Sequence, residues 1–506
     1  MKTLRSVAVA LAAMVIAATF GTGLAAAQSW QPLTHQPSFD AGAMLLLTDG
    51  TVMVVSEPNC LTCTNTDFSS WYKLTPDSSG SYVNGTWSQI ASFPSGYAPL
   101  YFSSAVLPDG RVIVEGGEYN CATGSCSAVW SNGGAIYDPL KNKWTKVNPP
   151  AGWTTIGDAQ SVVLANGTYM QANCCTKEEA LLNPSSLTWT ATGAGKFDIH
   201  DEEGWTLLPS GKVLTTDAYV FQYDANGTNS ELYNPATGAW SSAGSTIVQL
   251  WDSCGGENLA SYEVGPAVLR PDGTVFSTGS NTCGAGHTAI YNSRTGSWTA
   301  GPDFPGAYNV NDGPAALEPN GNVLVFTSLS RFYPPAGQFF EWDGTTLTLV
   351  TPPASAAQDA SFVGHLMVLP TGQIMFTDFS NDIEIFTPAG GYDPAWAPTI
   401  SSAPNTVQRG KSYTIFGTQF NGLSQGAAYG DDFQDATNYP LVRIVNQASG
   451  HVFYTRTHSP STMAVATGSK KVSTKFDVPA NVETGLSQLF VVANGIASSG
   501  YFVNVQ

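Results

Sequence analysis

Short apolar runs separated by tight turns recur along most of the chain. Each unit has an apolar run, a turn ending in glycine and a second run rich in β-branched residues, as in SAVLPDGRVIVEGG around Gly110. Such alternation around an Asp-Gly or Asn-Gly turn predicts a β-hairpin, because these residues tolerate the positive φ that the turn requires. The turn recurs seven times, at Gly50, Gly110, Gly167, Gly211, Gly273, Gly321 and Gly372.

A second hairpin follows the first in several units and ends in tryptophan, as in AIYDPLKNKW at Trp144. Two hairpins make a four-stranded sheet, so seven units predict a seven-bladed β-propeller over residues 28–397, with kelch-like repeats. The last unit, at Gly372, lacks a terminal Trp strand. We expect SWQPL around Trp30 to supply it and close the ring, which leaves no open sheet edge.

The pattern changes from about Pro398 to shorter strands with different turns. Residues 398–506 fit one small immunoglobulin-like β-sandwich. The predicted fold class is therefore all-β: a seven-bladed propeller followed by a C-terminal β-sandwich.

The first residues have the pattern of a secretory signal. Lys2 and Arg5 precede an apolar run, and Ala25-Ala26-Ala27 follows it. This order predicts a signal peptide over residues 1–27, cleaved after Ala27, and a secreted protein. A membrane anchor is the alternative, although no later apolar stretch is long enough to cross a bilayer.

The chain is sparsely charged and acidic. Charged residues make up 11% of the sequence, and 20 basic against 38 acidic residues give a net charge of −18. This charge disfavours binding to nucleic acid or to anionic membranes. We expect a monomer whose partner is a carbohydrate or another small polar molecule.

Eight cysteines in an exported chain indicate disulfides. Pairing between sequence neighbours is the simplest hypothesis. The expected pairs are Cys60–Cys63, Cys121–Cys126, Cys254–Cys283 and the vicinal pair Cys174–Cys175. A zinc site at Cys60 and Cys63 is the alternative, because their spacing resembles that of zinc ligands.

Acidic residues recur nine or ten positions before the turn glycines, where the chain enters the innermost strand of each blade. Such positions surround the mouth of the central channel. They hold Asp40, Tyr101, Asp158, Asp201 with Glu202, Glu263 and Asp312. Clustered carboxylates bind divalent cations or, as a pair with separated pKa values, hydrolyse glycosidic bonds. A solvated rim is the alternative interpretation.

The densest polar stretch begins at Asp198 and contains His200, Asp201 and Glu202, followed by Trp205. A histidine beside carboxylates suits a general base or a metal ligand, so these three residues are the candidate catalytic group. A solvated loop explains the stretch equally well. Aromatic rings near a channel suit stacking on sugars. The candidate ligand-binding residues are Tyr119, Trp205, Asp158, Glu263 and Asp312.

Residues 28–506 resemble the galactose oxidase and glyoxal oxidase family. The resemblance rests on YFSSAVLPDGRVIVEGGEYNC in the second unit, VLPTGQIMFTDFSNDIEIFTP in the last unit, and FYTRTHSP in the tail. It implies a copper-dependent oxidase of alcohols or aldehydes, in which Tyr101 is the radical tyrosine and His458 the ligand from the sandwich.

The resemblance retains only part of the copper site. The positions of the family's axial Tyr-His pair hold Phe362 and Val363, which have no donor atoms, and no cysteine lies near Ala41, where the family has its thioether. His365 is the nearest substitute ligand. The candidate metal ligands are therefore Tyr101, His458 and His365, with copper a possible but not the favoured cofactor.

The sequence leaves three functions open. The first is a secreted propeller that binds carbohydrate at the channel mouth. The others are a copper oxidase with a degenerate site and a glycoside hydrolase or lyase that uses His200, Asp201 and Glu202. Whether the protein is an enzyme is undecided at this stage.

Overall fold

The computed structural model describes residues 27–58, 67–122, 126–220, 227–252, 254, 262–281, 283–329 and 336–506. Residues 1–26 of the predicted signal peptide lie outside this part of the chain. Cys60 and Cys63 also lie outside it, and with them the predicted disulfide and the zinc alternative. No helix in the described ranges is both long enough and apolar enough to span a bilayer.

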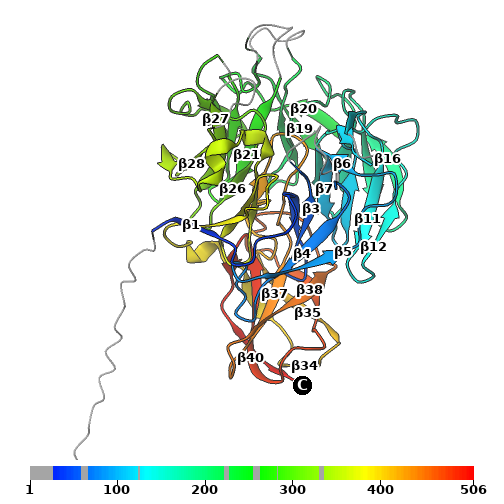
Figure 1. Cartoon of the computed structure of the whole chain (residues 1–506), viewed down its shortest axis with the longest axis vertical. Helices are drawn as coiled ribbons and strands as arrows, with labels where there is room; N and C mark the ends of the chain where they lie inside the picture. The colour runs from blue at the N-terminus through cyan, green and yellow to red at the C-terminus, as the bar shows by residue number, and fades with distance from the viewer. Residues whose placement is uncertain are drawn as a thin grey trace, which may run out of the picture.

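Seven four-stranded antiparallel blades form from the described residues, and Figure 1 shows them above the strands of the C-terminal part. Blade 1 has β2 (Ala41–Leu46), β3 (Val52–Ser56), β4 (Trp71–Thr75) and β5 (Thr86–Ile90). Blade 2 has β7 (Ser103–Val106), β8 (Val112–Glu115), β11 (Gly134–Asp138) and β12 (Lys143–Lys146). Blade 3 has β13 (Ser161–Val163), β14 (Tyr169–Ala172), β15 (Glu179–Asn183) and β16 (Thr188–Thr192).

The remaining blades repeat this order. Blade 4 has β17 (Thr206–Leu207), β18 (Val213–Thr216), β19 (Ser230–Asn234) and β20 (Ala239–Ser242). Blade 5 has β21 (Val264–Leu269), β22 (Thr274–Gly279), β23 (Thr288–Asn292) and β24 (Ser297–Ala300). Blade 6 has β26 (Ala315–Leu317), β27 (Val323–Leu329), β28 (Gln338–Trp342) and β29 (Leu347–Val350), with β25 (Tyr308–Asn309) paired to β27.

Blade 7 closes the ring in the way that the sequence predicts. It has β30 (His365–Val368), β31 (Ile374–Thr377) and β32 (Glu384–Thr387), and its outer strand is β1 (Ser29–Pro32) from the start of the chain. Trp30 lies opposite Phe386 in this pair. The last blade therefore has no open edge, and separation of β1 from β32 would expose one.

The seven turn glycines all adopt positive φ, between 76° at Gly50 and 90° at Gly321. Each therefore has the backbone that the Asp-Gly and Asn-Gly pattern requires. The prediction of seven hairpins, and with it that of a seven-bladed all-β propeller, is confirmed.

The tryptophans that end the blades tie each blade to the preceding one. The indole N–H of Trp144 donates to the carbonyl oxygen of Ala91, and that of Trp189 to the carbonyl oxygen of Asn148, each at 2.8 Å. Trp298 donates to the hydroxyl of Ser230 in blade 4 at 2.9 Å. The indole donors of these three tryptophans are therefore all paired, which matters most for the buried one of Trp298.

The C-terminal part is a curled antiparallel sheet in which β34 joins parallel to β42. Its strands are β33 (Thr399–Ser402), β34 (Thr406–Val407), β35 (Ser412–Thr418), β37 (Leu441–Asn446), β38 (Val452–His458), β39 (Val472–Asp477), β40 (Gly485–Ala493), β41 (Ile496–Ala497) and β42 (Tyr501–Val505). The sheet encloses its own core, which includes Ile415, Val442, Phe476 and Leu489. This arrangement is that of a propeller followed by a sandwich, as predicted.

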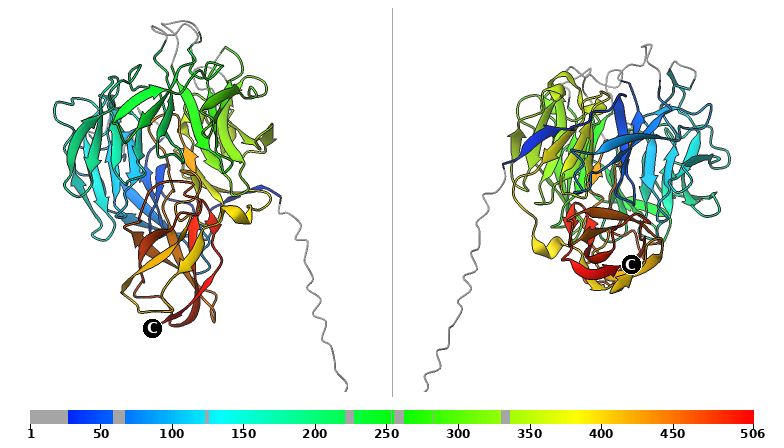
Figure 2. Two further views of the ribbon diagram at one scale, coloured as in Figure 1. Left: turned by 180° about the vertical axis from the view of Figure 1, so that it is seen from behind. Right: turned by 60° about the horizontal axis from the view of Figure 1, so that its bottom comes forward.

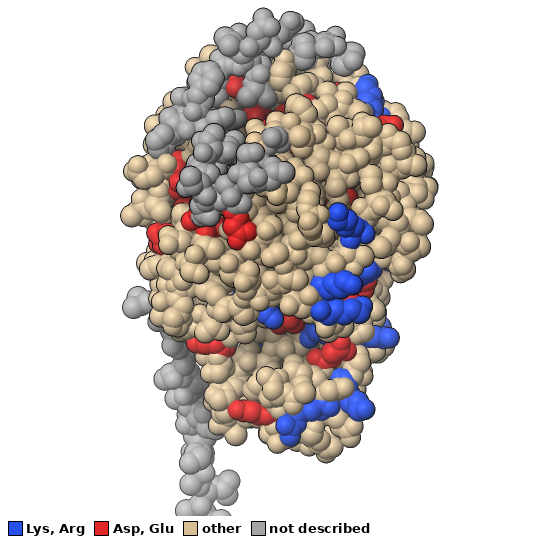
Figure 3. Space-filling view, turned by 45° about the vertical axis from the view of Figure 1, so that its right-hand side comes forward, with Lys and Arg blue, Asp and Glu red and all other residues tan. Residues whose placement is uncertain are grey.

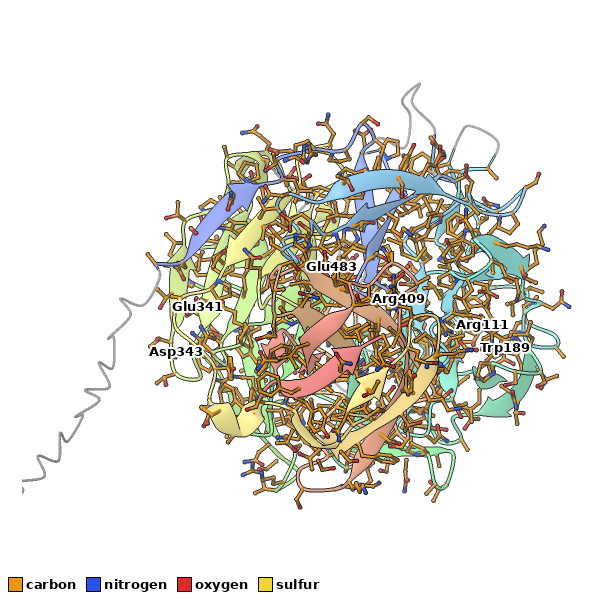
Figure 4. All side chains as sticks on the ribbon, turned by 90° about the horizontal axis from the view of Figure 1, so that it is seen from below. Arg111, Trp189, Glu341, Asp343, Arg409 and Glu483 are labelled. Carbon is orange, nitrogen blue, oxygen red and sulfur yellow. A yellow bond between two sulfur atoms is a disulfide. The ribbon has the colours of Figure 1, made fainter. Side chains whose placement is uncertain are left out.

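The C-terminal sheet covers one face of the propeller (Figures 2 and 4). It contacts the turns at the far ends of the innermost strands: the amide of Thr457 donates to the carbonyl oxygen of Thr48, and that of Ser459 to the carbonyl oxygen of Pro108. The opposite ends of the same strands therefore face away from the sheet.

Short elements complete the described part of the chain. A small sheet of β6 (Pro99–Leu100), β9 (Tyr119–Asn120) and β10 (Ser127–Ala128) lies beside blade 2. The 3-10 turns are η1 (Ser355–Gln358), η2 (Ser361–Val363) and η3 (Pro394–Trp396). Three disulfides join the cysteines as predicted from their spacing: Cys121–Cys126, Cys174–Cys175 and Cys254–Cys283.

Candidate functional site

An acidic cavity of about 300 Å³ lies at the mouth of the channel, on the face that the C-terminal sheet leaves open. Seven carboxylates, three tyrosines and one phenylalanine line it. These residues are Tyr101, Glu118, Tyr119, Asp158, Glu202, Glu263, Asp312, Phe362, Tyr429, Asp431 and Asp432. Among the described residues, the lining contains no lysine, arginine or histidine.

Loops that lead into the innermost strands position most of these side chains. Tyr101 comes just before β7, Asp158 before β13, Glu202 before β17, Glu263 before β21 and Asp312 before β26. Since the innermost strands surround one channel and run in the same direction, the residues before them meet at one mouth. The structure thus brings together five of the positions found by counting back from the turn glycines.

Three of these residues adopt a left-handed backbone that non-glycine residues avoid. The φ angle is 52° at Tyr101, 57° at Glu202 and 47° at Asp312. Such conformations cost free energy and persist only where the surrounding structure imposes them, often at binding sites. The strained loops aim these side chains into the cavity.

The C-terminal part contributes a segment that sequence reasoning missed. β36 (Ala427–Ala428) pairs with β26, the innermost strand of blade 6, and so adds a strand inside the channel. Tyr429, Asp431 and Asp432 follow β36 and line the cavity. The one signal available was the adjacent Asp431-Asp432 pair in a chain with 11% charged residues.

The inserted segment is held by specific contacts. The hydroxyl of Tyr429 donates to the carbonyl oxygen of Phe362. A Cβ atom at Gly430 would lie 2.4 Å from Oδ1 of Asp312, so the two segments approach as closely as glycine permits. The amide of Asp432 donates to the side chain of Asp431 at 2.7 Å. The C-terminal part is therefore a component of the cavity as well as a cover for the opposite face.

Burial raises the pKa of the cavity carboxyls, and their neighbours raise it further. Desolvation, opposed by a backbone hydrogen bond and reinforced by Glu263, raises the pKa of Asp158 to about 6. Desolvation followed by Asp158 raises the pKa of Glu118 to about 8. The pKa of Glu202 and that of Asp312 lie well above the usual value for the same reasons. Several cavity carboxyls therefore hold protons at neutral pH, unless a ligand supplies donors or positive charge.

Three carboxylates converge most closely. One oxygen each of Glu202, Glu263 and Asp312 lies within 4.8 Å of the other two. Oxygens at this spacing suit a shared proton, a hard cation or a group of ligand hydroxyls. The cluster is the acidic centre of the cavity.

His200 does not belong to the cavity, which corrects its assignment to a catalytic group with Asp201 and Glu202. Its ring is fully buried; Nε2 lies 2.7 Å from Oε1 of Glu179, and Nδ1 lies 3.0 Å from Oε1 of Glu203. Burial alone would lower the pKa of His200, but these two carboxylates outweigh it and raise the pKa to about 9. A protonated, doubly paired imidazole has no lone pair with which to act as a base.

His200 adjoins a second buried group of charges around Lys196. The Lys196 ammonium pairs with Asp198, with Glu203 at 3.3 Å, with Asp217 at 3.2 Å and with Glu231 at 3.0 Å. All these side chains are almost completely buried. The loop thus sends nearby residues to opposite sides: Glu202 enters the cavity, whereas His200 and Glu203 enter this network.

Asp201 lies between the two regions. Desolvation, followed by Asp158, raises its pKa to about 8. Its Oδ1 lies 3.6 Å from Sγ of Cys174, at the vicinal disulfide. Asp201 therefore adjoins the rim of the cavity rather than its centre.

The prediction that Trp205 binds a ligand is also wrong. It is 1% exposed and packs on Trp240 and His200, with ring centroids 5.8 and 5.6 Å apart. A ring this deep in blade 4 supports the core and offers no face to a ligand. Tyr119, Asp158, Glu263 and Asp312 do line the cavity.

The candidate copper ligands are not brought together. Tyr101 lines the cavity, and His365 lies behind it, against Phe379 and Tyr429. Burial lowers the pKa of His365 to about 3. His458 lies on the far side of the propeller, where Nε2 is 3.2 Å from Oδ1 of Asp477. Because copper prefers imidazole and sulfur ligands, the oxygen-only lining does not fit the copper site that the resemblance implies.

The charge in the cavity contrasts with the surface. The face in Figure 3 is mostly uncharged, and its Lys and Arg side chains gather toward the C-terminal part. Seven carboxylates around one cavity are therefore a local concentration in a chain with 11% charged residues.

Comparison with solved structures gives weak likenesses over most of the chain. A copper-bound fungal alcohol oxidase of the AA5 family has 13% identity and a TM-score of 0.49, covering 95% of this chain and all of that one. Virginiamycin B lyase from Staphylococcus aureus has 8% identity and a TM-score of 0.45, covering 71% of this chain and 99% of that one.

A third likeness is to the extracellular domain of a putative hybrid two-component system from B. thetaiotaomicron. It has 10% identity and a TM-score of 0.45, covering 96% of this chain and 59% of that one. No family model and no curated protein matches the chain. Likenesses at this level assign neither a family nor an activity, so the function has to be inferred from the cavity.

Proposed function

We propose that the protein is an exported carbohydrate-binding propeller whose ligand occupies the acidic cavity at the channel mouth. The observation that carries the proposal is the lining of the cavity. Seven carboxylates and three tyrosines surround a volume of about 300 Å³, and none of the described residues that line it is basic. This volume lies at the lower end of the range for small-molecule sites. The apolar run before Ala27 and the three disulfides support export.

The chemistry of the lining restricts the kind of carbohydrate. Carboxylates accept hydrogen bonds, so they suit sugar hydroxyls and the ammonium group of an amino sugar. The rings of Tyr101 and Tyr119, whose centroids are 6.0 Å apart, offer apolar surface to the C–H faces of a pyranose. Burial among acidic groups, with no basic side chain in the described lining, disfavours any further negative charge, so uronate, sulfate and phosphate groups are unfavourable ligands here. We therefore propose neutral and amino sugars as ligands and exclude anionic ones.

The test is binding to immobilised glycans of three kinds: neutral sugars, amino sugars and uronates. The mature protein is compared with the double variant Glu202→Gln/Asp312→Asn, which keeps the shape of the cavity and removes two carboxylates. We expect binding to neutral or amino sugars, none to uronates, and a loss of at least tenfold in affinity in the double variant. Wild-type protein that binds no sugar, or that prefers uronates, would contradict the proposal.

Glycoside hydrolysis is a second candidate, favoured by the convergence of Glu202, Glu263 and Asp312. Retaining glycosidases place two carboxyl groups about 5 Å apart and keep one protonated at neutral pH. Burial and neighbouring carboxylates favour the protonated form of Glu202. A lyase is less suitable, because the uronate substrates of polysaccharide lyases would be repelled here.

Hydrolysis is tested by the release of reducing ends from oligosaccharides that the protein binds. In a hydrolase, Glu202→Gln abolishes turnover, and oxygen is not consumed. Binding without any release of reducing ends leaves the protein a binding module and removes this second candidate.

A further inference from the structure

An exposed indole lies at the rim of the cavity and has no role in the core. Trp130 is 42% exposed and follows β10, next to Val129, which is 47% exposed. The amides of both residues donate to the carbonyl oxygen of Glu118, at 2.9 Å from Val129 and 3.1 Å from Trp130. Glu118 lines the cavity with its side chain. The rim residues are therefore fixed to the wall of the cavity.

The vicinal disulfide lies next to this indole. A Cβ atom at Gly157 would be 2.9 Å from Cδ1 of Trp130 and 2.8 Å from Cβ of Cys174, so the glycine lies between the two side chains. Asp158, the next residue, lines the cavity. Cys175 is exposed. Cys174 is 2% exposed, so the disulfide reaches the surface through Cys175, close to Trp130 and to the acidic lining.

The Trp130 backbone is held in an uncommon conformation. Its φ angle is 41°, in the left-handed region that a bulky residue avoids. Its hydrogen bond to Glu118 and its packing at Gly157 hold it there. The rim of the cavity therefore fixes the position of the indole without burying it.

We propose that Trp130 and the Cys174–Cys175 disulfide form an outer subsite, on which the second sugar ring of an oligosaccharide stacks while its first ring occupies the cavity. The inference rests on the proposed function. An indole and a disulfide are apolar, polarisable surfaces that suit the C–H face of a pyranose. A cavity of about 300 Å³ holds few rings, so a longer ligand extends out of it, and Trp130 lies beside the wall that Glu118 forms.

The size of this surface favours a sugar ring over a protein partner. A stable protein interface buries about 800 Å² on each partner, far more than one indole and one disulfide offer. An oligosaccharide whose first ring already occupies the cavity, in contrast, reaches the indole without an additional binding event. The ligand is therefore an oligosaccharide of two or more neutral or amino sugars.

The test is calorimetric titration with glucose and glucosamine and with their linear dimers and tetramers. Wild-type protein is compared with Trp130→Ala and with the control Leu140→Ala, which removes a 70% exposed side chain from the β11–β12 turn of the same blade. We expect Trp130→Ala to weaken the tetramer about tenfold, equivalent to about 1.4 kcal/mol. It should change monosaccharide affinity by less than about twofold, and Leu140→Ala should change neither.

The outcomes separate the two proposals. Wild-type protein that binds no sugar of any length contradicts the proposed function. Wild-type protein that binds a tetramer no more tightly than a monosaccharide, or a Trp130→Ala variant that keeps tetramer affinity, contradicts the outer subsite alone. Equal weakening of the monosaccharide and the tetramer in Trp130→Ala also contradicts it, because the indole would then act on the cavity itself.

Discussion

Gly430 of the C-terminal part packs directly on Asp312 of blade 6, so that an added Cβ would lie 2.4 Å from Oδ1 and 3.0 Å from the Cα of Asp312. This contact joins the segment after β36 to the acidic centre of the cavity. It explains how residues more than 100 positions apart in the sequence form one lining. Any side chain at position 430 must displace one of the two segments.

Gly430→Ala is therefore expected to disturb the cavity. Overpacking at a closely packed site costs about 1–3 kcal/mol of stability, and here it also moves Asp431 and Asp432, which line the cavity. Urea unfolding and carbohydrate titration measure the two effects. Gly391→Ala is the matched control, since a Cβ there meets nothing within 4 Å. Equal behaviour of the two variants would show that the close approach is unimportant.

Stability is expected to fall as the pH rises from about 5 to about 9. Burial keeps Asp201 and Glu118 protonated to about pH 8 in the fold, whereas both ionise near pH 4 when the chain unfolds. Between these values the unfolded chain binds fewer protons, so the free energy of unfolding decreases with pH. His200, with its pKa raised to about 9, has the same sign: its contribution is complete below about 6.5 and lost through 9.

Thermal melting across this range measures the effect. A Tm that rises steadily from pH 5 to pH 9 would show that these carboxyls are not protonated in the fold. A ligand that donates hydrogen bonds or positive charge should reduce the slope, because it favours the ionised carboxylates.

Glu202→Gln should stabilise the protein at pH 8 while it weakens binding. The amide removes a carboxyl whose ionised form is disfavoured by burial and by Glu263. We expect a gain of about 1 kcal/mol. Glu483→Gln, which breaks an exposed pair with His451, should give no such gain. A Glu202→Gln variant that is less stable and keeps its affinity for the ligand would contradict the placement of the ligand beside Glu202.

Lys196→Met should destabilise the fold strongly without a direct effect on the ligand. The variant leaves a group of buried carboxylates, among them Glu203 and Asp217, without their common cation. Removal of one partner from a buried ion pair costs about 3–5 kcal/mol. Lys141→Met, at an exposed pair with Asp138, should cost about 0–1 kcal/mol. Equal losses, measured by urea unfolding, would mean that the network around Lys196 contributes little.

The sequence predicts the propeller because its signals are local. The positive φ of Gly50 and its six counterparts is required by each hairpin itself, and the missing outer strand of blade 7 indicates the role of Trp30. The gathering of Asp158, Glu263 and Asp312 follows from repeat register alone, since equivalent positions in a closed ring share one end.

The sequence predicts the site wrongly where the position of a side chain depends on contacts between residues distant in sequence. His200 and Glu202 are two positions apart, and only the packing of blades 3 and 4 decides which of them enters the cavity. The insertion of Tyr429 depends on the pairing of β36 with β26, which no repeat signal marks. The resemblance favoured His458 instead, although that residue lies on the opposite face of the propeller.

Hydrogen–deuterium exchange of the full-length mature protein, with and without a saturating oligosaccharide identified by titration, locates the ligand most directly. The account predicts slower exchange in the loops at residues 99–102, 117–120, 156–160 and 200–204 and in the inserted segment at 427–433, with little change in the outer strands of the C-terminal sheet. Protection confined to that sheet or to the outer blade strands, with the channel-mouth loops unchanged, would contradict it.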